Sequence, residues 1–186
     1  MTNLLHLWND DLAVAVDPGR GADILSLVHR SSGVDVLFST PWRDHADALR
    51  DGTTTPTTYD PVAGWLEAYR GGWQLLCPNA GPPRPVAGCP VGFHGEAANA
   101  RWDVVAADDA GCSLVTTLFS VPVRIERSLS LQSESLLVDD TLVNLCDVHL
   151  EIDYNSHPAF GGTFLEGRVT LDTGARRYTA DPGTTG

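Results

Sequence analysis

Apolar and polar residues alternate along several short segments of the chain. The clearest alternation runs over residues 148–155, and a second runs over residues 123–131, where only Arg127 interrupts it. Because successive side chains of a β-strand point to opposite faces, each segment is predicted to be a strand with one buried and one solvated face. The same pattern predicts further strands at residues 12–16, 23–29, 34–38, 101–106, 113–120, 135–143 and 168–171.

No window of comparable length keeps the apolar spacing of an amphipathic helix, so no helix is predicted. The chain instead has 18 glycines and 12 prolines between its apolar runs. Residues 39–61 are predicted to form a long surface loop, and residues 78–95, with five prolines and four glycines, a second one. Many short strands with polar outer faces indicate an all-β domain of antiparallel sheets, packed as a sandwich or closed as a barrel.

The composition narrows the classes of function. The chain has 186 residues, with 24 Asp and Glu against 12 Lys and Arg, which gives a formal charge of −12. Phosphate repels such a net anion, so neither nucleic acid nor a membrane is expected as a partner, whereas a neutral small molecule fits. No signal peptide or membrane span is predicted. The four dispersed cysteines are predicted to be reduced thiols of a cytoplasmic protein.

Two of the six histidines differ from the others in their local sequence. His94 lies in G-F-H-G-E at the end of the second proline-rich loop, and His157 lies in S-H-P-A-F-G-G, where the most strongly alternating segment ends. Pro158 restricts His157 to an extended backbone, and the glycines near both histidines let a ligand approach the main chain closely. Both are candidates for proton transfer, because a histidine titrates near neutral pH. The remaining four are predicted to be surface residues: His6, His29, His45 and His149.

Metal binding is an alternative use of the same residues. His94 and Glu96 form the H-x-E half of a zinc deaminase motif, but no P-C-x-x-C follows, and the histidine spacing of a cupin is absent as well. A site built from His94, Glu96 and His157 therefore stays open as a weaker hypothesis. The sequence contains no phosphate-binding loop, nucleophile elbow or dinucleotide fingerprint.

Several motifs in order resemble the aldose 1-epimerase, or galactose mutarotase-like, family. The run G-G-W-Q-L-L-C-P-N-A-G at residues 71–81 is followed by F-H-G-E at residues 93–96 and then by H-P-A-F-G at residues 157–161. Residues 21–27 are similar to the opening strand of that family, and residues 136–144 continue the order. The resemblance implies an antiparallel β-supersandwich that binds a free aldose, such as glucose or galactose, and interconverts its anomers without a cofactor or metal.

The resemblance also implies roles for individual residues. His157, in the H-P-x-F motif, matches the histidine that donates a proton to the ring oxygen, and His94 matches the one that holds the sugar near the anomeric centre. Asn79 matches the position of a polar contact to the sugar. The arginine that accompanies this loop in relatives corresponds to Arg84 or Arg70, and Arg84 is taken as the substrate contact.

One departure from the family pattern bears on activity. Members of the family carry the general base, a glutamate, on a strand near their C-terminus, and their chains are considerably longer than 186 residues. Residues 1–186 are therefore expected to form a single β-sandwich domain that is incomplete at its C-terminus. The general base is expected beyond Gly186, and the 186-residue chain alone is expected to have little activity. The alternative from another functional class is a non-catalytic carbohydrate-binding or sugar-sensing domain. The residues predict no oligomeric state.

Overall fold

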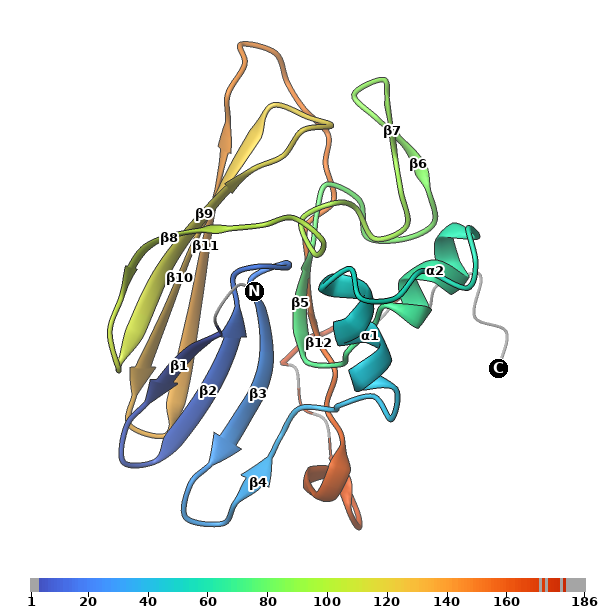
Figure 1. Ribbon diagram of the computed structural model, residues 1–186. Coiled ribbons are helices and arrows are strands. Elements are labelled where there is room, and N and C mark those ends of the chain that lie inside the picture. The colour runs from blue at the N-terminus through green and yellow to red at the C-terminus, as the bar shows by residue number, and fades with distance from the viewer. Residues whose placement is uncertain (1–3, 171, 173, 178, 180–186) are drawn as a thin grey trace.

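Two antiparallel β-sheets face each other in the computed structural model, which describes residues 4–170, 172, 174–177 and 179 (Figure 1). The six-stranded sheet contains β1 (Leu5–Trp8), β2 (Leu12–Asp17), β3 (Asp23–His29), β5 (Trp73–Leu76) and β12 (Asn155–Pro158) in that order, with β4 (Val34–Asp35) paired to β3. The four-stranded sheet has the order β11 (Ser135–Asn144), β10 (Val123–Gln132), β9 (Gly111–Thr117) and β8 (Asp103–Ala107).

The hydrophobic core lies between the two sheets. The buried members of the core come from alternate positions of the strands, as expected when one face of each sheet is packed. Arg127, which interrupts the alternation of β10, occupies one of these inward positions and is 2% exposed. Its guanidinium donates to Asp140 of β11 at 2.7 and 2.8 Å and lies 5.7 Å from the Trp102 ring, so the buried charge is paired.

Two short helices lie on the opposite face of the six-stranded sheet. Figure 1 shows α1 (Arg43–Arg50) and α2 (Pro61–Glu67) beside β5 and β12, on the side away from the four-stranded sheet. The hairpin consists of β6 (Arg84–Val86) and β7 (Cys89–Val91), and a 3-10 turn, η1, spans Gly162–Leu165. No helix in the described part of the chain is long and apolar enough to cross a bilayer.

The alternating segments at residues 12–16, 23–29, 123–131 and 135–143 are confirmed as parts of β2, β3, β10 and β11, and the segment 113–120 overlaps β9, which ends at Thr117. The expected strand at residues 148–155 is wrong: the chain is irregular until β12 begins at Asn155. Residues 148–154 have no ladder partner among the described residues, and alternation alone does not supply one. Residues 168–170 are not a strand either, and Leu171 lies outside the described residues.

The expected loop at residues 39–61 is also wrong, because it contains α1 and the start of α2. Of the two helices, α2 carries ordinary start signals, whereas α1 has no side-chain cap at its first turn. Asp60 accepts hydrogen bonds from the backbone N–H of Val62 and Ala63 at 3.1 and 2.8 Å, and Pro61 occupies the first helical position. The helices are too short to give the long apolar periodicity on which a sequence-based assignment depends. The proline-rich segment 78–95 is likewise not wholly irregular, because it forms the β6–β7 hairpin.

Candidate functional site

His157 lies on β12 and points to the helix side of the six-stranded sheet. β12 pairs antiparallel with β5, and His157 is directly opposite Gln74 in the register. Leu75, the next residue of β5, is buried in the core between the sheets. Neighbouring residues of a strand point to opposite faces, so Gln74 and His157 share the face that carries the helices.

His94 is held in a tight turn above this face. Its φ is +63°, a left-handed conformation that costs a histidine of the order of 1–3 kcal/mol and that clusters at functional sites. Its backbone N–H donates to the Gly81 carbonyl at 3.0 Å. The next residue, Gly95, lies so close to Cys77 that a Cβ would be 2.4 Å from the Cys77 carbonyl oxygen. The turn is therefore fixed by close backbone contact.

The two histidine rings lie together beside an indole. The His94 and His157 ring centroids are 5.8 Å apart. Trp65 of α2 stands edge-on to both rings, 4.7 Å from His94 and 6.5 Å from His157, and its other contacts include a stacked Tyr69 at 4.8 Å. Phe93 packs against His94 at 3.9 Å. Three separate parts of the chain thus converge on one half-buried aromatic cluster.

The two rings present the same nitrogen to the outside. Nδ1 of His94 and Nδ1 of His157 are both buried without a hydrogen-bond partner among the described residues. The Nε2 atoms are not buried in this way, so each is the nitrogen available to a ligand. Because a buried N–H without an acceptor is more costly than an unpaired lone pair, we assign the proton of the neutral rings to Nε2.

The surroundings of His94 fix its charge. Burial, followed by the proximity of His157, lowers the pKa of His94 to about 4. His94 is therefore neutral at physiological pH, where its Nε2–H donates a hydrogen bond without being a strong acid. The cluster therefore places a neutral hydrogen-bond donor, His94, beside a second imidazole, His157.

A row of polar side chains crosses the sheet behind His157. Asp17 of β2 is opposite Asp23 of β3, the Gln74 amide of β5 donates to Asp23 at 3.3 Å, and Gln74 is opposite His157. Arg70 binds this row, donating to Asp17 at 2.6 Å and to Asp23 at 3.2 Å. Complete burial raises the pKa of Asp23 to about 6, against the opposing effect of the Arg70 guanidinium. Sequence reasoning missed this row because its members meet only through strand pairing.

Asn79 is buried and bonded within the loop that carries His94. Its amide donates to the carbonyls of Gly81, Pro82 and Gly92 at 2.8–3.1 Å, and its side-chain oxygen accepts from Arg84 Nε at 3.0 Å. Asn79 thus orders the loop that ends at His94. Arg84 is exposed and forms an ion pair with Asp153 at 2.6 Å. Arg70, the other arginine considered for a substrate contact, is 2% exposed and fully engaged with carboxylates.

Glu96 does not join the histidines as a metal ligand. One of its oxygens accepts from the backbone N–H and the hydroxyl of Ser120 at 3.1 and 2.9 Å. Within the described part of the chain, no group of three or more His, Cys, Asp or Glu side chains could hold a metal ion. The three-ligand site considered from the sequence is therefore not formed in this structure.

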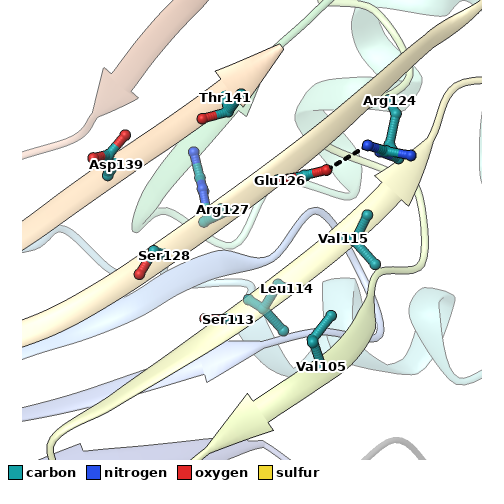
Figure 2. A pocket seen from close by; sticks show the side chains of 10 residues that line it. All are labelled: Val105, Ser113, Leu114, Val115, Arg124, Glu126, Arg127, Ser128, Asp139 and Thr141. Carbon is teal, nitrogen blue, oxygen red and sulfur yellow. Dashed lines mark ion pairs between the residues drawn. The ribbon is translucent and has the colours of Figure 1, made fainter. Parts of the chain in front are cut away.

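A broad hollow of about 690 Å³ lies on the outer face of the four-stranded sheet. Figure 2 shows that serine, threonine and charged side chains line it, with an Arg124–Glu126 ion pair of 2.7 Å. Neither histidine lines this hollow. Most of its polar side chains occupy the outward positions of β9, β10 and β11, as on any solvated sheet face, whereas Arg127 is an inward residue.

Comparison with solved structures agrees with this architecture. The chain is similar to a galactose mutarotase-like protein from Lactobacillus casei ATCC 334 (16% identity, TM-score 0.55; 76% of this chain and 44% of that one). It is similar to a galactose mutarotase related enzyme from Lactobacillus acidophilus (15% identity, TM-score 0.66; 90% of this chain and 52% of that one). It is also similar to an Escherichia coli K12 protein assigned provisionally as an aldose 1-epimerase (15% identity, TM-score 0.53; 76% of this chain and 46% of that one).

The chain thus spans about half the length of these solved structures. No protein-family model and no curated protein matches it. Identities near 15% establish the fold alone, so the activity has to be argued from the side chains of the site. The resemblance seen in the sequence motifs is confirmed at that level: the chain has the all-β, galactose mutarotase-like sandwich fold.

Proposed function

We propose that the histidine cluster belongs to an aldose 1-epimerase, which interconverts the α and β anomers of a free aldose. The observation that carries the proposal is the pairing of two histidines 5.8 Å apart, with His94 held neutral by a pKa of about 4. Anomer exchange needs an acid that gives a proton to the ring oxygen and a base that takes the proton of the C1 hydroxyl, and a neutral donor such as His94 can orient the sugar between them. The similarity to mutarotase-like structures supports the same reaction.

In the proposed reaction, His157 in its imidazolium form donates the Nε2 proton to the ring oxygen O5 as the C1–O5 bond breaks. A base removes the proton of the C1 hydroxyl, so that C1 becomes the aldehyde carbon of the open chain. Rotation about C1–C2 and the reverse proton transfers close the ring with the other configuration. His94 donates its Nε2–H to a sugar oxygen near C1. Such acid–base assistance is typically worth ~10²–10⁴-fold per group.

The remaining assignments are proposals of the same kind. We take the base to be the glutamate that the resemblance implies, and no described carboxylate is assigned that role. Arg84 is exposed at the start of β6 and remains the proposed arginine contact to the sugar, while Asn79 orders the adjoining loop. The four cysteines are free thiols, which is consistent with the predicted cytoplasmic location.

Polarimetry of freshly dissolved α-D-glucose and α-D-galactose tests the proposal on a version of the protein that contains both the histidine cluster and the glutamate base. The expected result is a faster relaxation of optical rotation, which His157→Asn slows by at least about 100-fold, in line with the loss of a general acid. The matched control is His149→Asn, which alters an exposed histidine outside the cluster. Relaxation that matches the buffer alone, or that His157→Asn leaves unchanged, would contradict the proposal.

A second candidate is a carbohydrate-binding or sugar-sensing domain without catalysis. The aromatic wall formed by Trp65 and Phe93 favours it, because an indole binds the apolar face of a sugar whether or not a base is present. Calorimetry separates the two functions: saturable binding of glucose or galactose with unchanged relaxation of optical rotation identifies the binding domain.

A further inference from the structure

Two buried polar side-chain atoms lie on directly opposed residues of β5 and β12. Gln74 Oε1 and His157 Nδ1 are both buried, and neither has a partner among the described residues. Gln74 itself is 3% exposed, although it carries a full carboxamide. Directly opposed residues of antiparallel strands have Cβ atoms about 4.5–5.5 Å apart, which brings the two side chains within reach of each other.

The orientation of the Gln74 amide is set from the other side. Its Nε2 donates to the Asp23 carboxylate at 3.3 Å. A carboxylate accepts hydrogen bonds, so the NH₂ end of the amide faces β3 and the carbonyl end is left for β12. Asp23 is in turn fixed by Arg70 at 3.2 Å, and Arg70 by Asp17 at 2.6 Å. The amide cannot turn over without giving up its bond to this buried ion-pair network.

The chemistry of the acid step requires an acceptor at this place. A histidine that donates a proton from Nε2 and ends neutral must start as an imidazolium with a second N–H at Nδ1. Nδ1 of His157 is buried, and a buried charged donor without an acceptor is strongly disfavoured. The neutral ring has a lone pair at Nδ1 instead, so that form of the ring offers Gln74 Oε1 no donor.

We propose that Gln74 is a positioning residue whose Oε1 accepts a hydrogen bond from Nδ1–H of His157 when that ring is an imidazolium. The acid role of the bond rests on the proposed function, whereas the bond itself does not. It holds the ring in one orientation, with Nε2 toward the sugar, and it stabilises the charged form from which the proton leaves. Asp23 and Arg70 act through Gln74 by holding its amide.

Other titratable groups around the ring must be separated from this effect. His94 faces His157 at 5.8 Å from the turn at residues 92–95, and Trp65 of α2 contributes no charge. Asp23 and Arg70 lie beyond Gln74 on the same sheet face. Substitution of Gln74 alone leaves all of these groups in place.

The experiment follows the ¹⁵N shifts of both His157 ring nitrogens against pH, without any sugar. Gln74→Met keeps the length of the side chain but removes the acceptor, and Gln74→Glu retains an acceptor oxygen. The matched control is Thr116→Val, which removes a buried hydroxyl that bonds the Arg101 carbonyl on the other sheet. All variants are first checked for the wild-type fold by circular dichroism.

Gln74→Met is expected to lower the midpoint of the His157 titration by about one pH unit, the size expected for one buried hydrogen bond to a charged group. Gln74→Glu is expected to keep the midpoint at or above the wild-type value, and Thr116→Val to leave it unchanged. If Gln74→Met does not fold, Gln74→Asn gives the same test, because it draws the acceptor back by one methylene. An unchanged midpoint in the folded Met or Asn variant overturns the proposal.

Polarimetry then distinguishes this inference from the proposed function. If the native protein accelerates anomer exchange, the acid limb of its pH–rate profile should shift with the NMR midpoint in each variant. If it does not, the NMR result still decides whether Gln74 bonds His157, and only the catalytic meaning of that bond is lost.

Discussion

The ring of His94 lies 5.8 Å from the ring of His157, and the turn that holds it there has a left-handed backbone at His94 itself. Neither residue has a charged partner in the described salt bridges. The rings therefore influence each other directly. Burial and this proximity keep His94 neutral, which leaves the cluster with at most one mobile charge near neutral pH.

The low pKa of His94 predicts a rise in stability with pH. The pKa of His94 is about 4 in the folded protein, against an ordinary value of 6.5. Between these two pH values the unfolded chain therefore binds more protons than the folded protein. The contribution of His94 to stability is fully present above pH 6.5 and is lost as the pH falls through 4. Urea unfolding at intervals from pH 4 to pH 7.5 should show this rise flattened in His94→Asn. An equal rise of stability with pH in His94→Asn and in the wild type would contradict the low pKa of His94.

The raised pKa of Asp23 predicts a fall in stability with rising pH, over a similar range of pH. Burial raises its pKa from 3.8 to about 6, so the folded protein binds more protons than the unfolded chain between these values. Its contribution is present at low pH and falls as the pH rises through 6, by on the order of 3 kcal/mol. Asp23→Asn is expected to remove that fall and so steepen the net rise between pH 4 and pH 6.

The Asn variant also leaves Arg70 with one carboxylate fewer, so its stability at any single pH is expected to be lower. The diagnostic quantity is therefore the slope of the unfolding free energy against pH. A slope equal to that of the wild type would show that Asp23 titrates normally in the folded protein.

Gly95 and Gly88 give a matched pair for the turn that carries His94. Both have a positive φ, of +74° and +83°, but a Cβ at Gly95 would lie 2.4 Å from the Cys77 carbonyl oxygen, whereas nothing lies within 4 Å at Gly88. Gly88→Ala is expected to cost about 1 kcal/mol through backbone conformation alone. Gly95→Ala should cost several kcal/mol more, because two backbone segments must separate.

Urea unfolding measures both variants. Because Glu96 and Ala97 also donate to the Cys77 carbonyl, Gly95→Ala should in addition change the His94 ring signals in the NMR spectrum, and Gly88→Ala should not. Equal losses of stability in the two variants would show that the close approach at Cys77 is not present in solution.

Residues 123–131 and 148–155 have the same alternation, but only the first became a strand. β10 is bonded on both sides, to β9 and β11, whereas residues 148–154 have no ladder among the described residues. Alternation reports that one side of a segment is buried, and Leu150 and Ile152 do pack against the core. Hydrogen-bond pairing is a long-range property that local alternation does not contain.

Only part of the candidate site could be predicted from the local sequence, as was true of the strands. Glycine and proline beside His94 and His157 were visible locally, and the structure brings these two residues together. Gln74 and Trp65 gave no local signal, because one acts through pairing of β5 with β12 and the other through a seven-residue helix. Their positions follow from how distant segments pack, which the pattern along the chain does not specify.

Trp65 predicts a measurable change in the charge of His94. Its indole lies 4.7 Å from the His94 ring, and burial is the main cause of the low pKa of that ring. Trp65→Ala should expose the ring to water, so the pKa of His94 should rise from about 4 toward its ordinary value of 6.5, whereas Trp65→Phe should keep most of the depression. Trp8→Ala, which removes an exposed indole on β1, is the control. An NMR titration of His94 that is unchanged in Trp65→Ala would contradict the assigned packing. A loss of sugar affinity of up to about tenfold in Trp65→Ala, read by calorimetry, would further identify the indole as the wall against which the sugar stacks.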